Sequence, residues 1–154
     1  MPRTRHPVLA ATVWGGLVAG TLDVGAASLI SGYNPVVILK YIAGGVLGKV
    51  SLTGGWNEAA LGMLLQWGMS IVIAAIYVLL TRKRIARSPQ WPWWGIGYGV
   101  VIFAVMNYLV VPFSALHAPP HFSTFSFVAN LAAMLLFGWI VALFANTKLR
   151  AATY

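Results

Sequence analysis

The sequence predicts an all-α membrane protein: a four-transmembrane-helix bundle with a short interfacial or re-entrant helix between the first two spans. Of its 154 residues, 60% are hydrophobic and only 8% are charged, which is too little polar surface to enclose a soluble domain. Four apolar runs are each about 20 residues long, the length that crosses ~30 Å of hydrocarbon as a helix. The basic residues lie mainly between and beside these runs.

Charge and cysteine content narrow the function classes. The formal net charge of +8 could indicate nucleic-acid binding, but the basic residues lie at helix ends, where lipid headgroups and the insertion machinery interact with them. We therefore expect the lipid bilayer as a partner and no nucleic acid. The chain has no cysteine, so disulfides and thiolate metal sites are excluded, and cysteine usage does not indicate the redox compartment.

The first span is expected over residues 8–30, after a short basic leader that contains Arg3 and Arg5. A signal peptide also begins with a basic stretch and an apolar run. This run, however, is longer than a typical signal region and contains an acid, Asp23, so we expect a retained helix.

A short helix is expected next, over residues 35–47. Asn34 followed by Pro35 is typical of a helix start, with an N-cap side chain and proline at the first helical position. Its 13 residues are too few to span a bilayer, so the segment is expected to lie in the interface or to re-enter the membrane. Residues 51–57 are expected to form a turn.

The remaining spans are expected over residues 58–80, 94–115 and 125–145, with Pro112 bending or ending the third. Chain 1–154 is thus expected to form a single integral membrane domain. Tryptophans at the start of the third span indicate an interfacial aromatic belt: Trp91, Trp93 and Trp94.

The distribution of basic residues predicts the orientation. Eight of the ten Lys and Arg residues fall on one side of the predicted spans, and only Lys40 and Lys49 fall on the other. Positive residues stay in the cytoplasm. We therefore expect a multi-pass membrane protein with both termini cytoplasmic.

One face of the first span carries small residues and the acid. Gly16, Gly20, Asp23 and Ala27 are spaced by four, three and four positions, so they share a helical face. Small residues on such a face allow another helix to approach closely, which makes the two glycines and the alanine predicted packing residues. Asp23 then faces protein, ~22 Å from the cytoplasmic end of the span and in the outer half of the membrane.

Polar residues of the other spans are expected at the same depth. The second span carries a polar and small stripe in which Gly62 is a further predicted packing residue: Glu58, Gly62, Gln66 and Ser70. Because alternate helices run in opposite directions, the candidate ligand- or ion-binding residues converge in the outer half: Asp23, Glu58, Gln66, Asn107 and Asn130. A polar group in hydrocarbon costs several kcal/mol without a partner, so we expect these residues to satisfy one another.

The sequence leaves two interpretations of this cluster open. In the first, Asp23 is hydrogen-bonded to Asn107 or Gln66 and fixes the register of the helices. In the second, the cluster opens to the periplasm and binds a proton, a cation or a small polar solute, because intramembrane acids often serve function.

The sequence gives little indication of a metal, cofactor or catalytic site. His117 and His121 are four residues apart, but Pro119 and Pro120 between them exclude a regular helix, so they are weak metal candidates. No histidine lies within a span, which argues against a b-type haem, and we expect no cofactor. Ser114 lacks a Gly-x-Ser-x-Gly context, and no catalytic residue can be named.

The third span resembles uncharacterised small four-helix bacterial inner-membrane proteins, broadly similar to the YagU-type family. The motifs that carry the resemblance lie in the first and third spans and before the second: Gly97-Tyr98-Gly99, Val105-Met106-Asn107-Tyr108, Val111-Pro112-Phe113-Ser114-Ala115, Gly16-x-x-x-Gly20-x-x-Asp23 and Gly54-Gly55. The resemblance implies a four-helix protein of the bacterial inner (plasma) membrane without an assigned reaction. Members often have histidine where this chain has Gln66 and Asn130, and this departure argues against a metal or proton-relay role there.

The leading hypothesis is therefore a structural, accessory or partner-binding membrane component without evident catalytic machinery. Its partner would be a second copy of the chain or another membrane protein. The alternative is a small oligomeric transporter or channel that uses the outer-half cluster as a proton or cation site. An enzyme comes third, because no set of nucleophile, base and oxyanion donors can be named.

Overall fold

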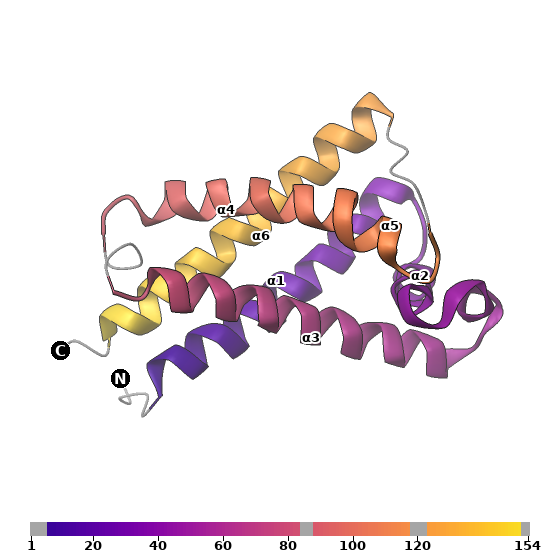
Figure 1. Cartoon of the computed structure of the whole chain (residues 1–154), viewed down its shortest axis with the longest axis horizontal. Coiled ribbons are helices and arrows are strands. Elements are labelled where there is room, and N and C mark those ends of the chain that lie inside the picture. The colour runs from indigo at the N-terminus through magenta and orange to yellow at the C-terminus, as the bar shows by residue number, and fades with distance from the viewer. Residues whose placement is uncertain (1–5, 84–87, 118–122, 152–154) are drawn as a thin grey trace.

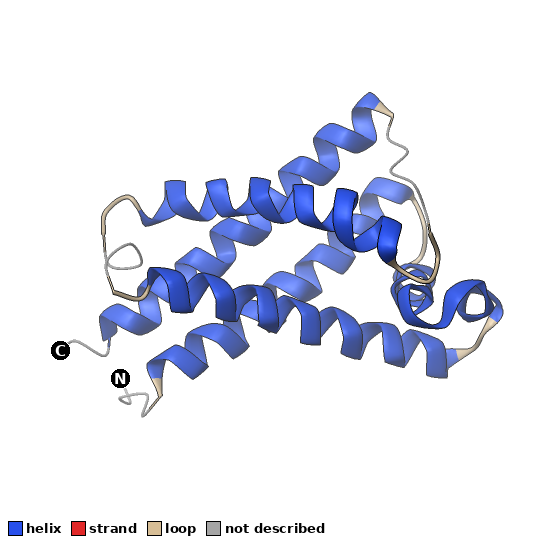
Figure 2. Cartoon of the chain, in the orientation of Figure 1, coloured by secondary structure: helices blue, strands red, loops and turns tan. Residues whose placement is uncertain are grey.

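Residues 6–83, 88–117 and 123–151 are described by the computed structural model, and every regular element among them is helical (Figure 2). Their order is α1 Pro7–Ser31, α2 Pro35–Leu47, the 3₁₀ helix η1 Gly48–Thr53, α3 Trp56–Thr81, α4 Trp91–Val105, the π-helix η3 Met106–Val110, α5 Val111–Phe113 and α6 Thr124–Ala151. Five segments of this described part are long and apolar enough to cross a membrane, by length and composition. The prediction of an all-helical chain is confirmed, and the apolar helices indicate a multi-pass membrane protein.

The long helices α1, α3, α4 and α6 run between the two ends of the molecule (Figure 1). The start of α1, the end of α3, the start of α4 and the end of α6 lie at one end, whereas α2 and α5 lie at the other. The central helices are α1 and α6, which pack against each other. On their other sides α6 contacts α4 and α1 contacts α3, and α2 packs against α3. The apolar core is made by α1, α3 and α6, with residues such as Ala11, Ala74, Val78, Val141 and Ala145.

The predicted start of α2 is confirmed. The side-chain oxygen of Asn34 accepts a hydrogen bond from the backbone N–H of Val36 at 2.9 Å, and Pro35 occupies the first helical position. Just before this cap, α1 ends at Gly32, whose φ of 73° is left-handed and whose N–H donates to the Ser28 carbonyl. Glycine adopts this conformation without the penalty of a Cβ.

Beyond α2 the chain folds back on itself. Residues 48–53, partly assigned from sequence to a turn, form the 3₁₀ helix η1, and Gly48 has a φ of 73°. The buried Ser51 hydroxyl donates to the carbonyl oxygen of Lys40 at 3.0 Å. Residues this far apart in sequence would lie ~16 Å apart in a straight helix. The segment Pro35–Thr53, although 19 residues long, is therefore not one straight rod.

The third apolar segment changes its helical pitch near Pro112. Proline has no N–H, and its ring crowds the carbonyl four residues earlier, here that of Tyr108. A wider π-helical turn, η3, precedes the proline and accommodates it. The helix then ends at Phe113, as expected from the position of the proline.

The last helix extends past its predicted span, from residue 145 to Ala151. The added turns carry Asn146, which is buried, and Thr147, whose hydroxyl donates to the Leu143 carbonyl at 2.9 Å. Lys148 and Arg150 lie in the last turn, where a positive charge interacts favourably with the helix dipole.

Predicted packing glycines lie at close helix contacts. A Cβ on Gly16 would stand 2.6 Å from the Cα of Ile71 in α3, and one on Gly62 would overlap the backbone carbonyl of Leu39 in α2. These glycines therefore let α1 and α2 approach α3. Ala27 is half-buried, and its role in packing stays a prediction.

Candidate functional site

The structure brings two of the candidate polar residues together, Asp23 of α1 and Gln66 of α3. The Gln66 side-chain amide donates to the Asp23 carboxylate at 2.9 Å and to the Gly20 carbonyl at 3.3 Å. Gln66 is only 5% exposed, and Asp23 is partly buried. We call these two residues the Asp23–Gln66 pair.

The close approach of α1 and α3 makes this pair possible. A Cβ on Gly20 would stand 2.5 Å from the Ser70 hydroxyl oxygen, so any side chain at residue 20 would push the helices apart. Gly20 and Asp23 share a face of α1, while Gln66 and Ser70 share a face of α3. The small residues thus set the distance at which the amide reaches the carboxylate.

Two small cavities border Asp23. One lies between α1, α3, the α4–η3 segment and α6, with Ser70, Ile102 and Met134 in its wall. The other lies between α1 and α6, and Phe137 lines both. Each has a volume of about 20 Å³, which is room for about one water molecule. Sites for small organic ligands are larger, typically ~300–1,000 Å³.

A second polar contact joins the same two helices. The indole N–H of Trp67 donates to the Thr21 hydroxyl at 3.0 Å, and that hydroxyl donates to the Leu17 carbonyl at 2.8 Å. Trp67 follows Gln66 in sequence, so α1 and α3 are joined by side-chain hydrogen bonds on two neighbouring faces. Sequence analysis did not single out this contact, because tryptophan in a span is ordinarily lipid-facing or interfacial.

The two candidate asparagines bond within their own helices. The Asn107 amide donates to the Phe103 carbonyl at 2.9 Å, next to the π-helical turn. The Asn130 amide donates to the carbonyl of Ser126 at 2.7 Å and to its hydroxyl at 3.2 Å. Five polar residues were expected to hydrogen-bond to one another. Asp23 and Gln66 do so, whereas the amides of Asn107 and Asn130 bond to backbone carbonyls of their own helices.

Glu58 lies in the first turn of α3, apart from the pair. A Cβ on Gly54 would stand 2.5 Å from a carboxylate oxygen of Glu58, so this carboxylate lies over the turn that precedes the helix. A negative charge at a helix N-terminus is favourable. Its position is explained by the helix end, and a binding role stays a prediction.

The histidines form no metal cluster in the described part of the chain. His117 is exposed, has a positive φ of 47°, and places a ring nitrogen 3.3 Å from the Ala115 carbonyl oxygen. His121 lies outside the described residues. Among the residues described, no three His, Cys, Asp or Glu side chains are grouped so that they could hold a metal ion.

Two tyrosines of the core were not recognised from sequence. The Tyr98 hydroxyl of α4 donates to the Ile73 carbonyl of α3 at 2.8 Å, and its ring lies 5.0 Å from the ring of Tyr77. The Tyr77 hydroxyl is buried and has no hydrogen-bond partner among the described residues. The sequence did contain a signal for such a contact. A tyrosine within an apolar span predicts a hydrogen bond to another helix, because a buried hydroxyl needs a partner.

These tyrosines make a matched prediction. Tyr98→Phe is expected to lower the free energy of unfolding by about 0.5–1.5 kcal/mol, because a cross-helix hydrogen bond is lost. Tyr77→Phe should leave it unchanged or raise it, because a hydroxyl without a partner is removed. Thermal unfolding of both variants in one detergent measures the difference. Equal losses would show that the Tyr98 bond contributes nothing.

Comparison of the chain with protein families, curated proteins and solved structures finds no match. A function for the chain therefore has to come from the geometry of its polar pair, its cavities and its helix packing. Within the described part of the chain, the Asp23–Gln66 pair is the hydrogen bond that joins two candidate residues predicted from the sequence.

Proposed function

We propose that this chain is a small, non-enzymatic protein of the bacterial inner membrane that acts as a structural or accessory component of a membrane assembly. The observation that carries the proposal is the size of the space around the Asp23–Gln66 pair. Each adjoining cavity holds about 20 Å³, enough for a water molecule but not for a solute. A polar pair with so little space beside it serves to fix how α1 and α3 meet.

The proposed topology has four spans, α1, α3, the segment from α4 to α5, and α6. Five segments qualify by length and composition, but Pro35–Thr53 folds back at Ser51. The 13 residues of α2 extend over ~20 Å, which is short of the ~30 Å hydrocarbon core. We therefore place α2 and η1 at the periplasmic side, in the interface or re-entering the membrane.

The proposed orientation puts both termini in the cytoplasm. The start of α1 and the end of α6 lie at the same end of the molecule (Figure 1), as an even number of spans requires. Among the described residues, four basic side chains belong to that end, Arg82, Lys83, Lys148 and Arg150, and positive residues stay cytoplasmic. A fluorescent protein fused to the C-terminus is expected to fluoresce in cells. An active periplasmic reporter at the same position would contradict the topology.

The test of the accessory role is purification from native membranes. After mild crosslinking, the tagged full-length chain is expected to elute in a defined complex, with a second copy or another membrane protein in fixed ratio. A chain that remains monomeric under these conditions would refute the proposal. A variant without the tag, purified in parallel, identifies proteins that bind the resin alone.

A proton or cation site is the second candidate, and one observation favours it. Asp23 lines two water-sized cavities, and waters beside an acid can carry protons. Proteoliposomes decide between the two functions. The structural role predicts no proton or cation flux under an imposed gradient. Flux that Asp23→Asn abolishes while the fold stays intact would replace it with the transport role.

A further inference from the structure

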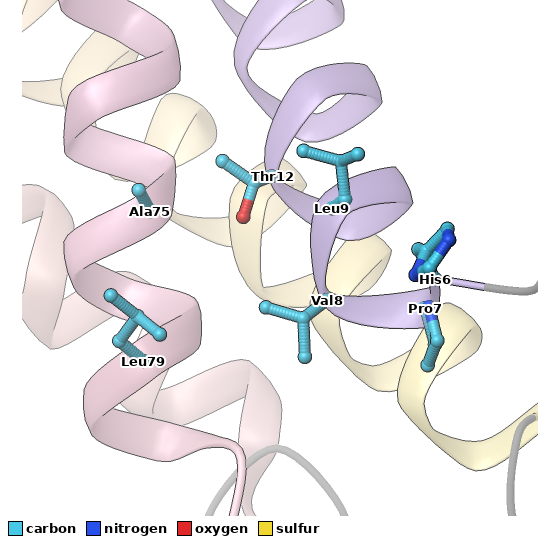
Figure 3. Close-up of a pocket in the computed structure, with 7 residues that line it drawn as sticks. All are labelled: His6, Pro7, Val8, Leu9, Thr12, Ala75 and Leu79. Atoms are coloured by element: carbon cyan, nitrogen blue, oxygen red, sulfur yellow. The ribbon is translucent and has the colours of Figure 1, made fainter.

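An apolar groove lies between the start of α1 and the end of α3 (Figure 3). Its volume is about 480 Å³, within the ~300–1,000 Å³ of small-molecule sites. The walls are formed by His6, which precedes α1, by Pro7, Val8, Leu9 and Thr12 of α1, and by Ala75 and Leu79 of α3. Because the side chain of Ala75 is small, space for the groove remains between α1 and α3. The groove is thus large enough for a ligand, and nearly all of its wall is apolar.

Positive charge adjoins the groove at the end of α3. Arg82 and Lys83 follow Leu79 by three and four residues, and Arg82 keeps helical backbone angles. Arg82 therefore shares a helix face with Leu79, one turn beyond the groove, and Lys83 follows Arg82 directly after the helix. Both side chains are exposed.

No side-chain carboxylate of this chain is placed to neutralise these residues. The sequence has two acids. Asp23 accepts a hydrogen bond from Gln66, and Glu58 lies in the first turn of α3, at the far end of that helix. An apolar groove that adjoins uncompensated positive charge is complementary to a molecule with an apolar chain and an anionic head.

We propose that this groove binds one anionic phospholipid, with an acyl chain between α1 and α3 and the phosphate beside Arg82 and Lys83. The proposal rests on the membrane topology given above, which puts this end of α3 at the cytoplasmic headgroups. Basic pockets between spans on that side are typical sites for anionic lipid headgroups. A free phosphate ion would contact the charges but leave the groove unfilled.

The test uses purified full-length protein in neutral detergent and native mass spectrometry. The probes are phosphatidylglycerol and phosphatidylcholine with identical acyl chains. Wild-type protein is expected to retain one phosphatidylglycerol in preference to phosphatidylcholine. Arg82→Gln with Lys83→Gln should weaken this binding by about tenfold to thirtyfold, given the usual contribution of each basic residue near a membrane.

Two further variants test the groove itself. Ala75→Phe fills it and should abolish the preference, whereas Val72→Phe introduces the same side chain at an exposed position of α3 that does not line the groove. The charge control is Lys40→Gln with Lys49→Gln, at the opposite end of the molecule. Size-exclusion chromatography establishes that each variant is folded.

Three results would overturn the proposal. The first is equal retention of phosphatidylglycerol and phosphatidylcholine by the wild-type protein, and the second is an Ala75→Phe variant that still prefers phosphatidylglycerol. The third is an equal loss of phosphatidylglycerol binding in the Arg82/Lys83 and Lys40/Lys49 double variants. The C-terminal reporter separates this outcome from failure of the topology. A cytoplasmic C-terminus without lipid preference rejects the lipid site alone. A periplasmic C-terminus rejects the topology on which the site rests.

Discussion

Gly99→Val is expected to lower the free energy of unfolding by about 3 kcal/mol or more, because α4 and α6 touch backbone to backbone at this glycine. A Cβ on Gly99 would overlap the Met134 carbonyl oxygen and stand 2.7 Å from the Cα of Leu135. From the other helix, a Cβ on Gly138 would stand 2.6 Å from the Gly99 nitrogen. Backbone atoms cannot rotate away as a side chain can. The helices would have to separate.

Gly97→Val is the matched control for this substitution. A Cβ on Gly97 meets nothing within 4 Å, and the residue lies two positions away on the same helix. Both variants add the same side chain to α4, so differences in helix propensity cancel. Thermal unfolding in one detergent measures the two effects. Similar midpoints for the two variants would show that α4 and α6 do not cross at Gly99.

Gln66→Leu is expected to have the second large effect, a loss of about 1–3 kcal/mol. Cross-helix hydrogen bonds in bilayers average about 0.6 kcal/mol and reach about 1.7 kcal/mol, so the lost bond alone does not account for the upper value. The larger part comes from Asp23, whose carboxylate loses the side chain that donates to it at 2.9 Å. A buried acid without a partner carries its full desolvation cost.

Replacing the other member of the pair, Asp23→Val, should lower the free energy of unfolding by less than Gln66→Leu does. Gln66 keeps the Gly20 carbonyl as an acceptor at 3.3 Å, so its amide is not stranded. The added methyl groups can enter the cavities beside residue 23, each of about 20 Å³. The same thermal unfolding measures both variants. Equal or greater loss in Asp23→Val would contradict the asymmetry.

Much of the fold could be predicted because hydropathy and capping act locally. The apolar runs and the Asn34-Pro35 start placed the helices within about three residues of their observed bounds, except at the end of α6, which lies six residues beyond the predicted end. The fold-back at Ser51 could not be predicted, because it depends on a hydrogen bond to Lys40, 11 residues earlier. Likewise the π-helical turn before Pro112 is one of several ways in which a helix accommodates a proline.

The candidate site was harder to predict, because depth in a membrane does not fix the rotation of a helix about its axis. Asp23 and Gln66 lie at one depth on faces that small residues also mark, and they meet. Asn107 and Asn130 were expected at that depth too, but each amide reaches a carbonyl of its own helix. Asparagine commonly bonds to nearby backbone groups, which competes with contacts across helices.

The main helix contact missed was that of α4 with α6. Gly95 and Gly99 are four residues apart and therefore share a helical face, a small-xxx-small pattern typical of close helix pairs. A Cβ on Gly95 would stand 2.9 Å from the Gly138 carbonyl oxygen. The pattern was present in the sequence, but no pattern identifies which helix will be the partner.

The most direct test of a structural role for the Asp23–Gln66 pair is the double variant Asp23→Val with Gln66→Leu. Replacing both members of a buried polar pair by apolar side chains leaves no stranded group, and this can be nearly neutral. The account predicts an unfolding midpoint above that of Gln66→Leu and close to that of the wild type, with assembly in native membranes retained. A double variant at least as unstable as the two single losses combined, or folded but unable to assemble, would contradict it.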